Sequence, residues 1–389
     1  MEFFSGIEFF LVLTMACIPA IILGVLEKSL KYYRIIASAI IIILFFSDDM
    51  RNFVFLISFL VLELLLIKIY LRLRRKGRKP SIYRTAIALS LLPLLFCKVS
   101  EITSLSIFQF LGVSYLSFRV IQIIIEIYDG IIKEFKILDY FDFLLLFSTF
   151  SSGPIDRSRR FLNDANITLE RLQYLELLGA GIQKIIIGVF YKFVLSIYIY
   201  QYVQAFANVY SPLKILEYSY AYGLYMFFDF AGYSFMAIGA SYIFGIRTPE
   251  NFNKPFMSLN MKEFWNRWHM SLSFWFRDFL FSRIVMVFIR KKCFKSKLTG
   301  ASIAFVINMA VMGLWHGLAV QYILYGIYHG VLLAATEIYE KKATIHRRFK
   351  NEYWYKCVSW LLTINFVMFG FLIFSGEFTD IIRILISKI

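Results

Sequence analysis

The sequence predicts an all-α protein that crosses a membrane several times. Of its 389 residues, 59% are hydrophobic and 17% are charged, whereas charged residues make up about 25% of ordinary soluble domains. The hydrophobic residues form many separate runs long enough to span a bilayer. Such runs must be helices or closed barrels, because hydrocarbon offers no water to backbone groups, and the alternating polar residues of a barrel are absent.

The first hydrophobic run, residues 7–26, resembles a signal peptide only in its length. Its start, MEFFSGIE, carries no basic segment, and no small-residue cleavage site follows the run. We therefore predict a retained first span. The residues that follow it include the basic Lys28, Lys31 and Arg34, which indicate a cytoplasmic loop and place the N-terminus outside.

Basic residues between the hydrophobic runs orient the remaining spans. A predicted span near 35–46 leads to the outer side at Asp48-Asp49, and a span near 52–71 returns to the cytoplasmic side. Two further spans, at 301–320 and 322–336, form a second such pair. We expect about eleven spans in a single membrane-embedded domain, residues 1–389, in the plasma membrane. The cytoplasmic side is marked by three basic clusters, at residues 72–79, 290–297 and 341–350.

Two segments interrupt hydrophobic stretches with residues that cannot continue a helix. Residues 151–154 read Ser-Ser-Gly-Pro, and residues 248–255 begin with Thr-Pro and end with Lys-Pro. Non-helical backbone at membrane depth is tolerated only where protein or a cavity surrounds it. These segments are predicted either to be re-entrant or interfacial elements that line a site, or to be ordinary surface loops.

Charge and cysteine usage exclude several classes of function. The net charge of +16 lies mostly in the short clusters between spans, so it reflects topology and anionic lipid rather than nucleic acid. The cysteines form no C-x-x-C pair and have no histidine at ligand spacing, so we predict neither disulfides nor a metal site. Nucleotide-binding loops, serine-hydrolase elbows and zinc-protease helices are also absent.

His316 is the first candidate for chemistry, because an ionisable group within a span is by default a functional hypothesis. It lies near the end of a hydrophobic run, with Gly313 before it and Gly317 after it. These small neighbours are expected to leave room for a substrate against the imidazole. A buried neutral histidine suits a general base, and the alternative is a core histidine bonded to a backbone carbonyl.

His269 is the second candidate. On a helix, Asn266, His269 and Ser273 would share one face. A polar face beside an aromatic face would suit one wall of a tunnel. The alternative is that the tryptophans form an interfacial belt, which is the commoner role of tryptophan at a membrane boundary. The apolar residues predicted to share the other face, four of them aromatic, are Trp265, Trp268, Leu272, Trp275 and Phe279.

The remaining polar residues receive structural interpretations. His329 is expected to hydrogen-bond neighbours such as Tyr325 and Thr336, and His346 is expected to be a solvated surface residue. Asp229 and the pair Arg277-Asp278 stand among apolar residues and must either pair internally or face a wet cavity.

Two motifs resemble the signature of the membrane-bound O-acyltransferase (MBOAT) family. These are Phe264-Trp265-Asn266-Arg267-Trp268-His269-Met270-Ser271-Leu272-Ser273 and Gly313-Leu314-Trp315-His316-Gly317. Shorter strings at 118–119, 128–130 and 149–157 resemble its D-alanyl transfer branch in Gram-positive bacteria, the DltB type, more than its alginate acetyltransferase branch. The resemblance runs from about residue 108 to residue 376.

The resemblance implies a ring of transmembrane helices around a central tunnel. The key histidine of the family falls on His316, and its second signature histidine falls on His269. The donor is expected to be D-alanine held as a thioester on the phosphopantetheine arm of a small acidic carrier protein, the DltC type, with no bound cofactor and no metal. The residues expected to position substrates in the tunnel are Trp265, Asn266, Trp268, Ser273, Gly313, Trp315 and Gly317.

The predicted reaction joins substrates that arrive from opposite faces. His316 takes a proton from an acceptor hydroxyl, and the oxygen attacks the thioester carbonyl. His269 and Asn266 polarise the carbonyl or orient the arm. The acceptor outside is lipoteichoic acid or an intermediate membrane protein. The carrier is expected to dock on Arg283, Ile284, Val285, Met286, Arg290, Lys291, Lys292 and Lys295, although positive-inside topology alone also explains these charges.

Two alternatives remain open at this point. The first is an O-acetyltransferase of an exported polysaccharide, with the same base and another donor. The second is a transporter or flippase, in which Asp229, Arg119 and Glu126 would be pathway groups rather than structural pairs.

Overall fold

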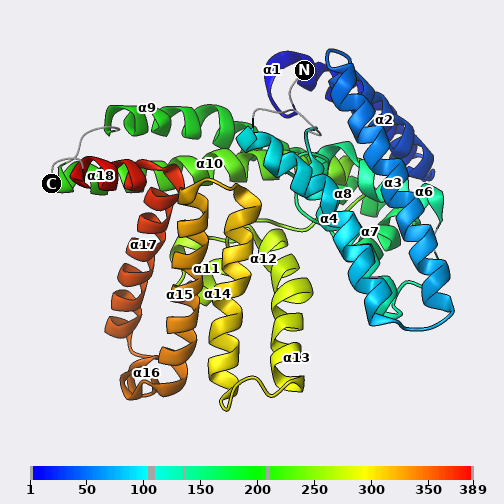
Figure 1. Ribbon diagram of the computed structural model, residues 1–389. Helices are drawn as coiled ribbons and strands as arrows, with labels where there is room; N and C mark the ends of the chain where they lie inside the picture. The colour runs from blue at the N-terminus through cyan, green and yellow to red at the C-terminus, as the bar shows by residue number, and fades with distance from the viewer. Residues whose placement is uncertain (1–2, 104–109, 135, 207–210, 387–389) are drawn as a thin grey trace. The chain divides into compact units, whose positions relative to one another are not determined.

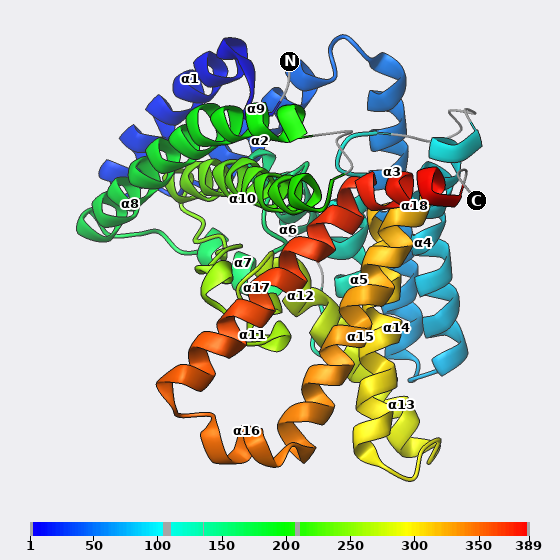
Figure 2. The same cartoon turned by 90° about the vertical axis from the view of Figure 1, so that its left-hand side faces the viewer.

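The computed structural model describes residues 3–103, 110–134, 136–206 and 211–386, which form helices joined by non-helical segments (Figures 1 and 2). No β-strand occurs within these ranges. The prediction of an all-α multi-pass membrane protein is confirmed, whereas the count of about eleven spans and the central tunnel stay predictions. The helices that are long and apolar enough to cross a membrane, within the same ranges, are Gly6–Val25, Met50–Arg75, Pro80–Ser100, Arg171–Phe206, Lys297–His316 and Tyr353–Ser375.

Residue contacts divide the chain into two compact units, which are described separately. Unit 1 comprises Met1–Val189 and Tyr233–Pro249, and unit 2 comprises Phe190–Gly232 and Glu250–Ile389. The long helix α10 (Pro212–Ile243) contributes its first part to unit 2 and its last part to unit 1. Each unit therefore combines segments that are distant in the sequence.

Unit 1 contains helices α1 to α8 and a 3₁₀ turn, Phe147–Thr149. The spans predicted near 7–26, 35–46 and 52–71 coincide with α1, α2 and α3 to within a few residues. The bounds are α1 Gly6–Val25, α2 Lys31–Phe45, α3 Met50–Arg75, α4 Pro80–Thr103, α5 Val113–Asp129, α6 Ile137–Leu145, α7 Ser158–Ala165 and α8 Arg171–Phe190.

Helix α5 forms the centre of unit 1, with α3 and α4 against it. Its residues are buried on every side from Leu116 to Ile127, including the polar Arg119, Gln122 and Glu126. Arg119 donates to the carbonyl oxygens of Phe143 at 2.9 Å and Thr149 at 2.7 Å. Glu126 accepts a hydrogen bond from the Ser158 hydroxyl at 2.6 Å. Arg119 and Glu126 are thus held inside the protein by structural contacts.

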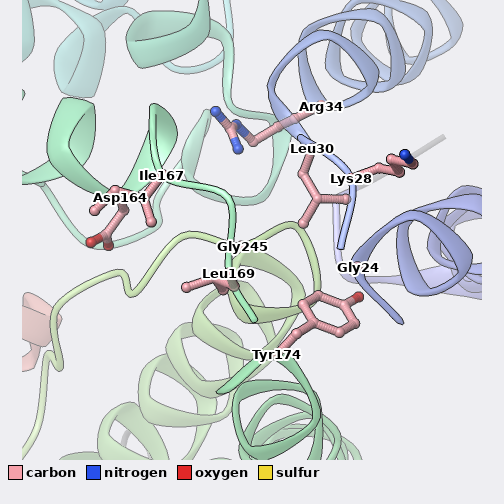
Figure 3. A pocket seen from close by; sticks show the side chains of 9 residues that line it. All are labelled: Gly24, Lys28, Leu30, Arg34, Asp164, Ile167, Leu169, Tyr174 and Gly245. Atoms are coloured by element: carbon pink, nitrogen blue, oxygen red, sulfur yellow. The ribbon is translucent and has the colours of Figure 1, made fainter. Parts of the chain in front are cut away.

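The basic residues after the first span are not all at a cytoplasmic surface. Arg34 is 1% exposed and binds both carboxylate oxygens of Asp142, at 2.8 and 2.6 Å. Lys31 pairs with Asp139 at 2.6 Å. Arg34 lines a cavity of about 10 Å³ beside Tyr174 (Figure 3), which has room for about one water molecule. Arg34 is therefore a core ion pair, and it was wrong to count it as a topology signal.

The predicted break at 151–154 is buried within unit 1. Ser151 is 6% exposed, and its hydroxyl hydrogen-bonds that of Tyr233. A Cβ added at Gly153 would lie 2.5 Å from the Thr149 Cα, so only glycine fits there. The break is a buried non-helical element, and the alternative of a surface loop is wrong.

Unit 2 contains the first part of α10, helix α9 and helices α11 to α18. Figure 1 shows α13, α14, α15 and α17 standing side by side. A 3₁₀ turn, Pro255–Met257, precedes α11, and a π-helical turn, Arg277–Phe281, joins α12 to α13. The bounds are α9 Ser196–Phe206, α11 Met261–Trp265, α12 Met270–Phe276, α13 Ser282–Arg290, α14 Lys297–His316, α15 Val320–Lys342, α16 Thr344–Phe349, α17 Tyr353–Ser375 and α18 Glu377–Ile386.

Glycines let α14 and α15 approach closely. A Cβ at Gly326 would lie 2.4 Å from the Met309 carbonyl oxygen, and one at Gly330 would lie 2.8 Å from the Val306 Cα. In a membrane, where apolar surface gains little from leaving lipid, small residues favour helix association through close contact. The two predicted spans at 301–320 and 322–336 are therefore one tightly joined helical pair.

The charged residues singled out in unit 2 are paired. Lys192 donates to Asp229 at 2.6 Å, and Arg277 donates to Asp278 at 2.9 Å. Each carboxylate thus has a basic partner within the chain, and the Arg277–Asp278 pair lies at an exposed position. Together with the contacts of Arg119 and Glu126, these pairs favour a structural role over an ion or substrate pathway.

Candidate functional site

His269 lies between two helices rather than within one. Helix α11 ends at Trp265 and α12 begins at Met270, while His269 has φ 43° and ψ 51°. This left-handed conformation is uncommon for a residue with a side chain and is kept only where surrounding contacts enforce it. The prediction that Asn266, His269 and Ser273 share one helical face is wrong, because the helix is interrupted between them.

The predicted break at 248–255 supplies the contacts that enforce this conformation. The Met270 amide donates to the Asn251 carbonyl at 2.9 Å, and the Asn253 amide donates to the Arg267 carbonyl at 3.0 Å. Asn251 is 1% exposed and Pro255 is also buried, whereas Asn253 and Lys254 are exposed, so this segment is anchored in the core and is not wholly a surface loop. Two non-helical segments thus bind each other through backbone hydrogen bonds at His269.

The Asn251 side chain also fixes the chemical form of His269. Its Oδ1 accepts from the Ser271 hydroxyl at 2.6 Å and amide at 3.3 Å, and lies 3.4 Å from His269 Nδ1. Because the Ser271 amide can only donate, Oδ1 is the acceptor and Nδ1 carries the hydrogen. The lone pair of neutral His269 is therefore on Nε2. The ring is 4% exposed and stands edge-on to Phe230, with 4.7 Å between centroids.

His316 ends α14 inside a group of aromatic rings. Its ring centroid lies 4.8 Å from that of Trp315, 5.2 Å from Phe374 and 6.2 Å from Tyr325. His316 is neither fully buried nor fully exposed, and the neighbouring rings limit its orientation. His316 and His269 are close enough to interact electrostatically. The structure thus brings the two predicted histidines into one neighbourhood of unit 2.

The glycines beside His316 serve helix contact rather than substrate space. A Cβ at Gly313 would lie 2.3 Å from the Tyr322 carbonyl oxygen, and one at Gly317 would lie 2.6 Å from the Tyr322 ring. The expectation that these glycines leave room for a substrate is wrong, because Tyr322 of α15 already occupies that space. Their function is to let α15 approach the end of α14.

His329 lies among the same aromatic rings as His316, although the sequence predicted only a structural role for it. It is 1% exposed, its ring lies 4.5 Å from Tyr325 and 5.2 Å from Trp265, and its Nδ1 has no hydrogen-bond partner among the described residues. The predicted bonding to Thr336 is wrong, because that hydroxyl donates to the Leu332 carbonyl at 2.8 Å. The repeated His-Gly pair, at 316–317 and 329–330, was the signal available in the sequence.

The tryptophans of this region are core residues. Trp265 is 6% exposed, and Trp268 and Trp275 are each 5% exposed. The Trp268 ring stacks on Phe264 at 5.7 Å and meets Phe371 of α17 edge-on at 5.0 Å. An interfacial aromatic belt would leave these rings at the lipid boundary, so that alternative is wrong for these three residues.

A cavity of about 240 Å³ lies between α11, α12, α14 and α15. Trp265, Asn266 and Ser273 line it, as the tunnel prediction requires for these three, whereas neither His269 nor His316 does. Met312, which also lines the cavity, precedes His316 by one turn of α14. The cavity therefore ends close to His316 along α14.

Lys262 holds α11 against α15. It pairs with Glu337 at 2.8 Å and also contacts Glu340. Burial lowers the pKa of Lys262, but the hydrogen bonds that its ammonium group donates to these carboxylates outweigh burial and raise that pKa above its usual value. Lys262 remains charged under ordinary conditions, so this ion pair network fixes the start of the segment that leads to His269.

The residues predicted to dock a carrier lie along α13 and the turn after it. No residue of α13 is buried, and Met286 is 44% exposed. Helix α12, the π-helical turn and α13 run without a break from Met270 to Arg290, a length of roughly 30 Å. His269 therefore directly precedes this helix, and Lys291 and Lys292 directly follow it.

His346 is not the solvated surface residue that was predicted. Its Nδ1 lies 2.9 Å from the hydroxyl oxygen of Tyr355. The same Tyr355 hydroxyl donates a hydrogen bond to the hydroxyl oxygen of Tyr339 at 3.1 Å. His346 lines a cavity of about 490 Å³ together with residues of α15, α16 and α17. No residue predicted for the site lines this larger cavity, so volume alone does not locate the chemistry.

The whole chain is similar to known proteins. A family model described as MBOAT, membrane-bound O-acyltransferase family, matches residues 40–378. The chain is 42% identical over 386 residues to Teichoic acid D-alanyltransferase of Bacillus subtilis (strain 168), covering 96% of this chain and 98% of the relative. It is 38% identical over 399 residues to the protein of that name from Streptococcus thermophilus (strain ATCC BAA-250 / LMG 18311), covering 96% and 94%.

A second group of relatives matches a shorter part. Probable alginate O-acetylase AlgI of Pseudomonas syringae pv. tomato (strain ATCC BAA-871 / DC3000) is 32% identical over 277 residues, which cover 69% of this chain and 49% of the relative. Both histidine motifs, at 264–273 and 313–317, lie within the range matched by the family model.

Proposed function

This chain belongs to the membrane-bound O-acyltransferase family, and we propose that it transfers D-alanine to teichoic acid, with lipoteichoic acid as the final acceptor. The observation that carries the proposal is the near full-length similarity to teichoic acid D-alanyltransferases, which covers 94–98% of those relatives. Relatives named as alginate O-acetylases share only about half of their own length with the chain. D-alanyl transfer is therefore favoured over polysaccharide acetylation.

The proposed donor is a D-alanyl thioester on the phosphopantetheine arm of an acidic cytosolic carrier protein. A thioester is already activated, which fits a chain without a nucleotide-binding loop. The exposed apolar residues of α13, followed by Arg290, Lys291 and Lys292, offer a surface of complementary charge and partly apolar character. The arm would then extend alongside α12 and α13 toward the histidines.

His316 is the proposed general base. Its imidazole accepts the proton of the acceptor hydroxyl as the oxygen attacks the thioester carbonyl, and the new ester forms as the carbon–sulfur bond breaks. The imidazolium then returns the proton to the leaving thiolate, so the products are an ester and a free thiol. The incomplete burial of His316 and the aromatic rings around it support this role, because these rings hold the imidazole in orientation.

His269 is proposed to orient the donor arm. With its hydrogen on Nδ1 toward Asn251, neutral His269 presents a lone pair at Nε2 and accepts hydrogen bonds there. An acceptor cannot stabilise a developing oxyanion, so this geometry supports orientation of an N–H donor in place of carbonyl polarisation. The earlier alternative of an oxyanion role is thereby disfavoured for the neutral ring.

The test is transfer from labelled D-alanyl carrier by the purified full-length protein in lipid nanodiscs supplied with a hydroxyl acceptor. His316→Gln should lower the rate by on the order of 10²–10⁴. His346→Gln, a histidine bonded to Tyr355 away from this site, is the matched control and should retain activity. Near-normal transfer by the His316 variant would exclude it as the base, and equal use of an acetyl thioester would favour the acetyltransferase alternative.

A further inference from the structure

We propose that the 490 Å³ cavity lined by α15, α16 and α17 binds an anionic phospholipid, with its phosphate at Lys350 and Lys356 and one acyl chain between α15 and α17. The cavity lies outside both histidine motifs, and none of the residues assigned to the reaction lines it. The proposal therefore goes beyond the transferase activity, and its test needs neither donor nor acceptor.

The residues that line the cavity change from basic to apolar along α17. Lys350 follows α16, which joins α15 to α17 (Figure 2), and Lys356 lies in the first turn of α17. Val358, Leu362 and Phe366 come next on α17 and also line the cavity. From Lys356 to Phe366 the helix rises roughly 15 Å, a length comparable with half of the hydrocarbon core of a bilayer. The cavity therefore has a basic end and an apolar part of acyl-chain length.

The apolar part is accessible from the bilayer. Val358, Leu362 and Phe366 are exposed, and they belong to a helix that is long and apolar enough to cross a membrane. Leu332 and Ala335 of α15 also line this part of the cavity. Cavities of about 300–1,000 Å³ are large enough for small-molecule ligands. A hydrocarbon chain of the surrounding lipid can therefore reach these side chains.

The charges at the basic end favour an anionic headgroup. Lys350 and Lys356 are exposed, and neither ammonium group pairs with a carboxylate among the residues that the structure describes. Glu340 also lines the cavity, but it is held by Lys262. Basic pockets between membrane helices on the cytoplasmic side bind anionic lipid headgroups. A zwitterionic headgroup would bring its own cation beside the two lysines, so an anionic phospholipid fits better.

Positive-inside topology is the alternative explanation for these charges. It accounts for the basic cluster at 341–350, but it gives the lysines that line the cavity no advantage over their basic neighbours. Lys342 and Arg348 are exposed members of the cluster that do not line the cavity. They are therefore matched controls, because their replacement changes the charge of the same region by the same amount.

The experiment compares two lipids that differ only in the headgroup. Purified full-length protein in detergent is titrated with phosphatidylglycerol or with phosphatidylcholine of the same chains, and native mass spectrometry measures the bound lipid. The wild type should bind phosphatidylglycerol more tightly, and Lys350→Gln with Lys356→Gln should weaken this binding about fivefold per lysine. Lys342→Gln with Arg348→Gln should retain the preference. Equal affinity of the wild type for both lipids, or an equal loss in the control, would overturn the proposal.

The acyl-chain part of the cavity is tested separately. Ala335→Phe adds a ring to the apolar part and should weaken the binding of both lipids, whereas Val331→Phe, at an exposed position of α15 outside the cavity, should not. Thermal unfolding without added lipid checks that both variants are folded. Lipid binding that Ala335→Phe leaves unchanged would contradict the proposed chain position.

A free anion is distinguished from a lipid by a headgroup without chains. Glycerol 3-phosphate carries the phosphate but buries no hydrocarbon, so it should bind the wild type far more weakly than phosphatidylglycerol. Comparable affinity for the two would identify a site for a free phosphate compound and overturn the assignment to a lipid.

Discussion

His269 adopts a left-handed backbone conformation, which is unfavourable for a residue with a side chain. Asn251 stabilises this conformation through four hydrogen bonds to residues 269–271. Strained residues of this kind persist where surrounding contacts determine them, and they occur often at functional sites. The same asparagine sets which imidazole nitrogen carries hydrogen. Geometry and protonation at His269 therefore depend on one residue outside the family motifs.

Replacing Asn251 tests this dependence. Asn251→Leu should lower transfer by up to about a hundredfold, because a misplaced orienting group loses the benefit of exact positioning. The measurement is the rate of D-alanyl transfer together with its pH profile, which should shift because the His269 tautomer is no longer fixed. Asn253→Leu, an exposed asparagine in the same segment, is the control. An unchanged rate and pH profile in the Asn251 variant would show that the tautomer is irrelevant.

At the level of the elements, α14 and α15 are joined through glycines, and this contact positions both His316 and His329. Gly326 meets the Met309 carbonyl oxygen, and Gly313 meets that of Tyr322. Each helix thus fits against backbone atoms of the other, which cannot move aside as a flexible side chain can. Spacing in the sequence placed both helices, but it could not show that their glycines face one another.

A pair of alanine substitutions separates helix contact from helix propensity. Gly326→Ala would place a methyl group 2.4 Å from a carbonyl oxygen, and overpacking of this kind costs about 1–3 kcal/mol. Gly179→Ala in α8 meets nothing within 4 Å, so it should leave stability unchanged or raise it slightly. Thermal unfolding in nanodiscs measures both, and equal stability of the two variants would contradict the close contact.

At the level of the whole molecule, the net charge of +16 serves topology and, in our proposal, carrier recognition. The basic residues after α13 follow exposed apolar residues, whereas Arg34 and Lys192 elsewhere in the chain are paired with carboxylates. Charges that lie exposed beside apolar side chains are available to an acidic partner. Association through such charges is weakened by salt because exposed charges are screened.

Charge reversal tests the docking surface. Lys291→Glu with Lys292→Glu should slow carrier association, with an effect that is largest at low salt and fades as salt rises. Arg72→Glu with Lys76→Glu, in exposed positions of another basic cluster, changes the net charge equally and should leave association intact. Surface plasmon resonance with the acidic carrier measures both. If both double variants bound the carrier at the same rate, the charges after α13 would have no specific role in docking and would only orient the spans.

The sequence by itself determined the class of the protein and its two motif histidines. Hydrophobic runs longer than a bilayer needs can only be helices in lipid, and residue types near 269 and 316 identify the family, because both properties are local to the chain. The tertiary structure decided the rest. His269 proved to lie between two helices, Tyr322 proved to occupy the space beside the glycines that flank His316, and His329 proved to lie against Trp265 and Tyr325. These facts depend on which distant segments meet, and periodicity within one segment carries no information about its partner.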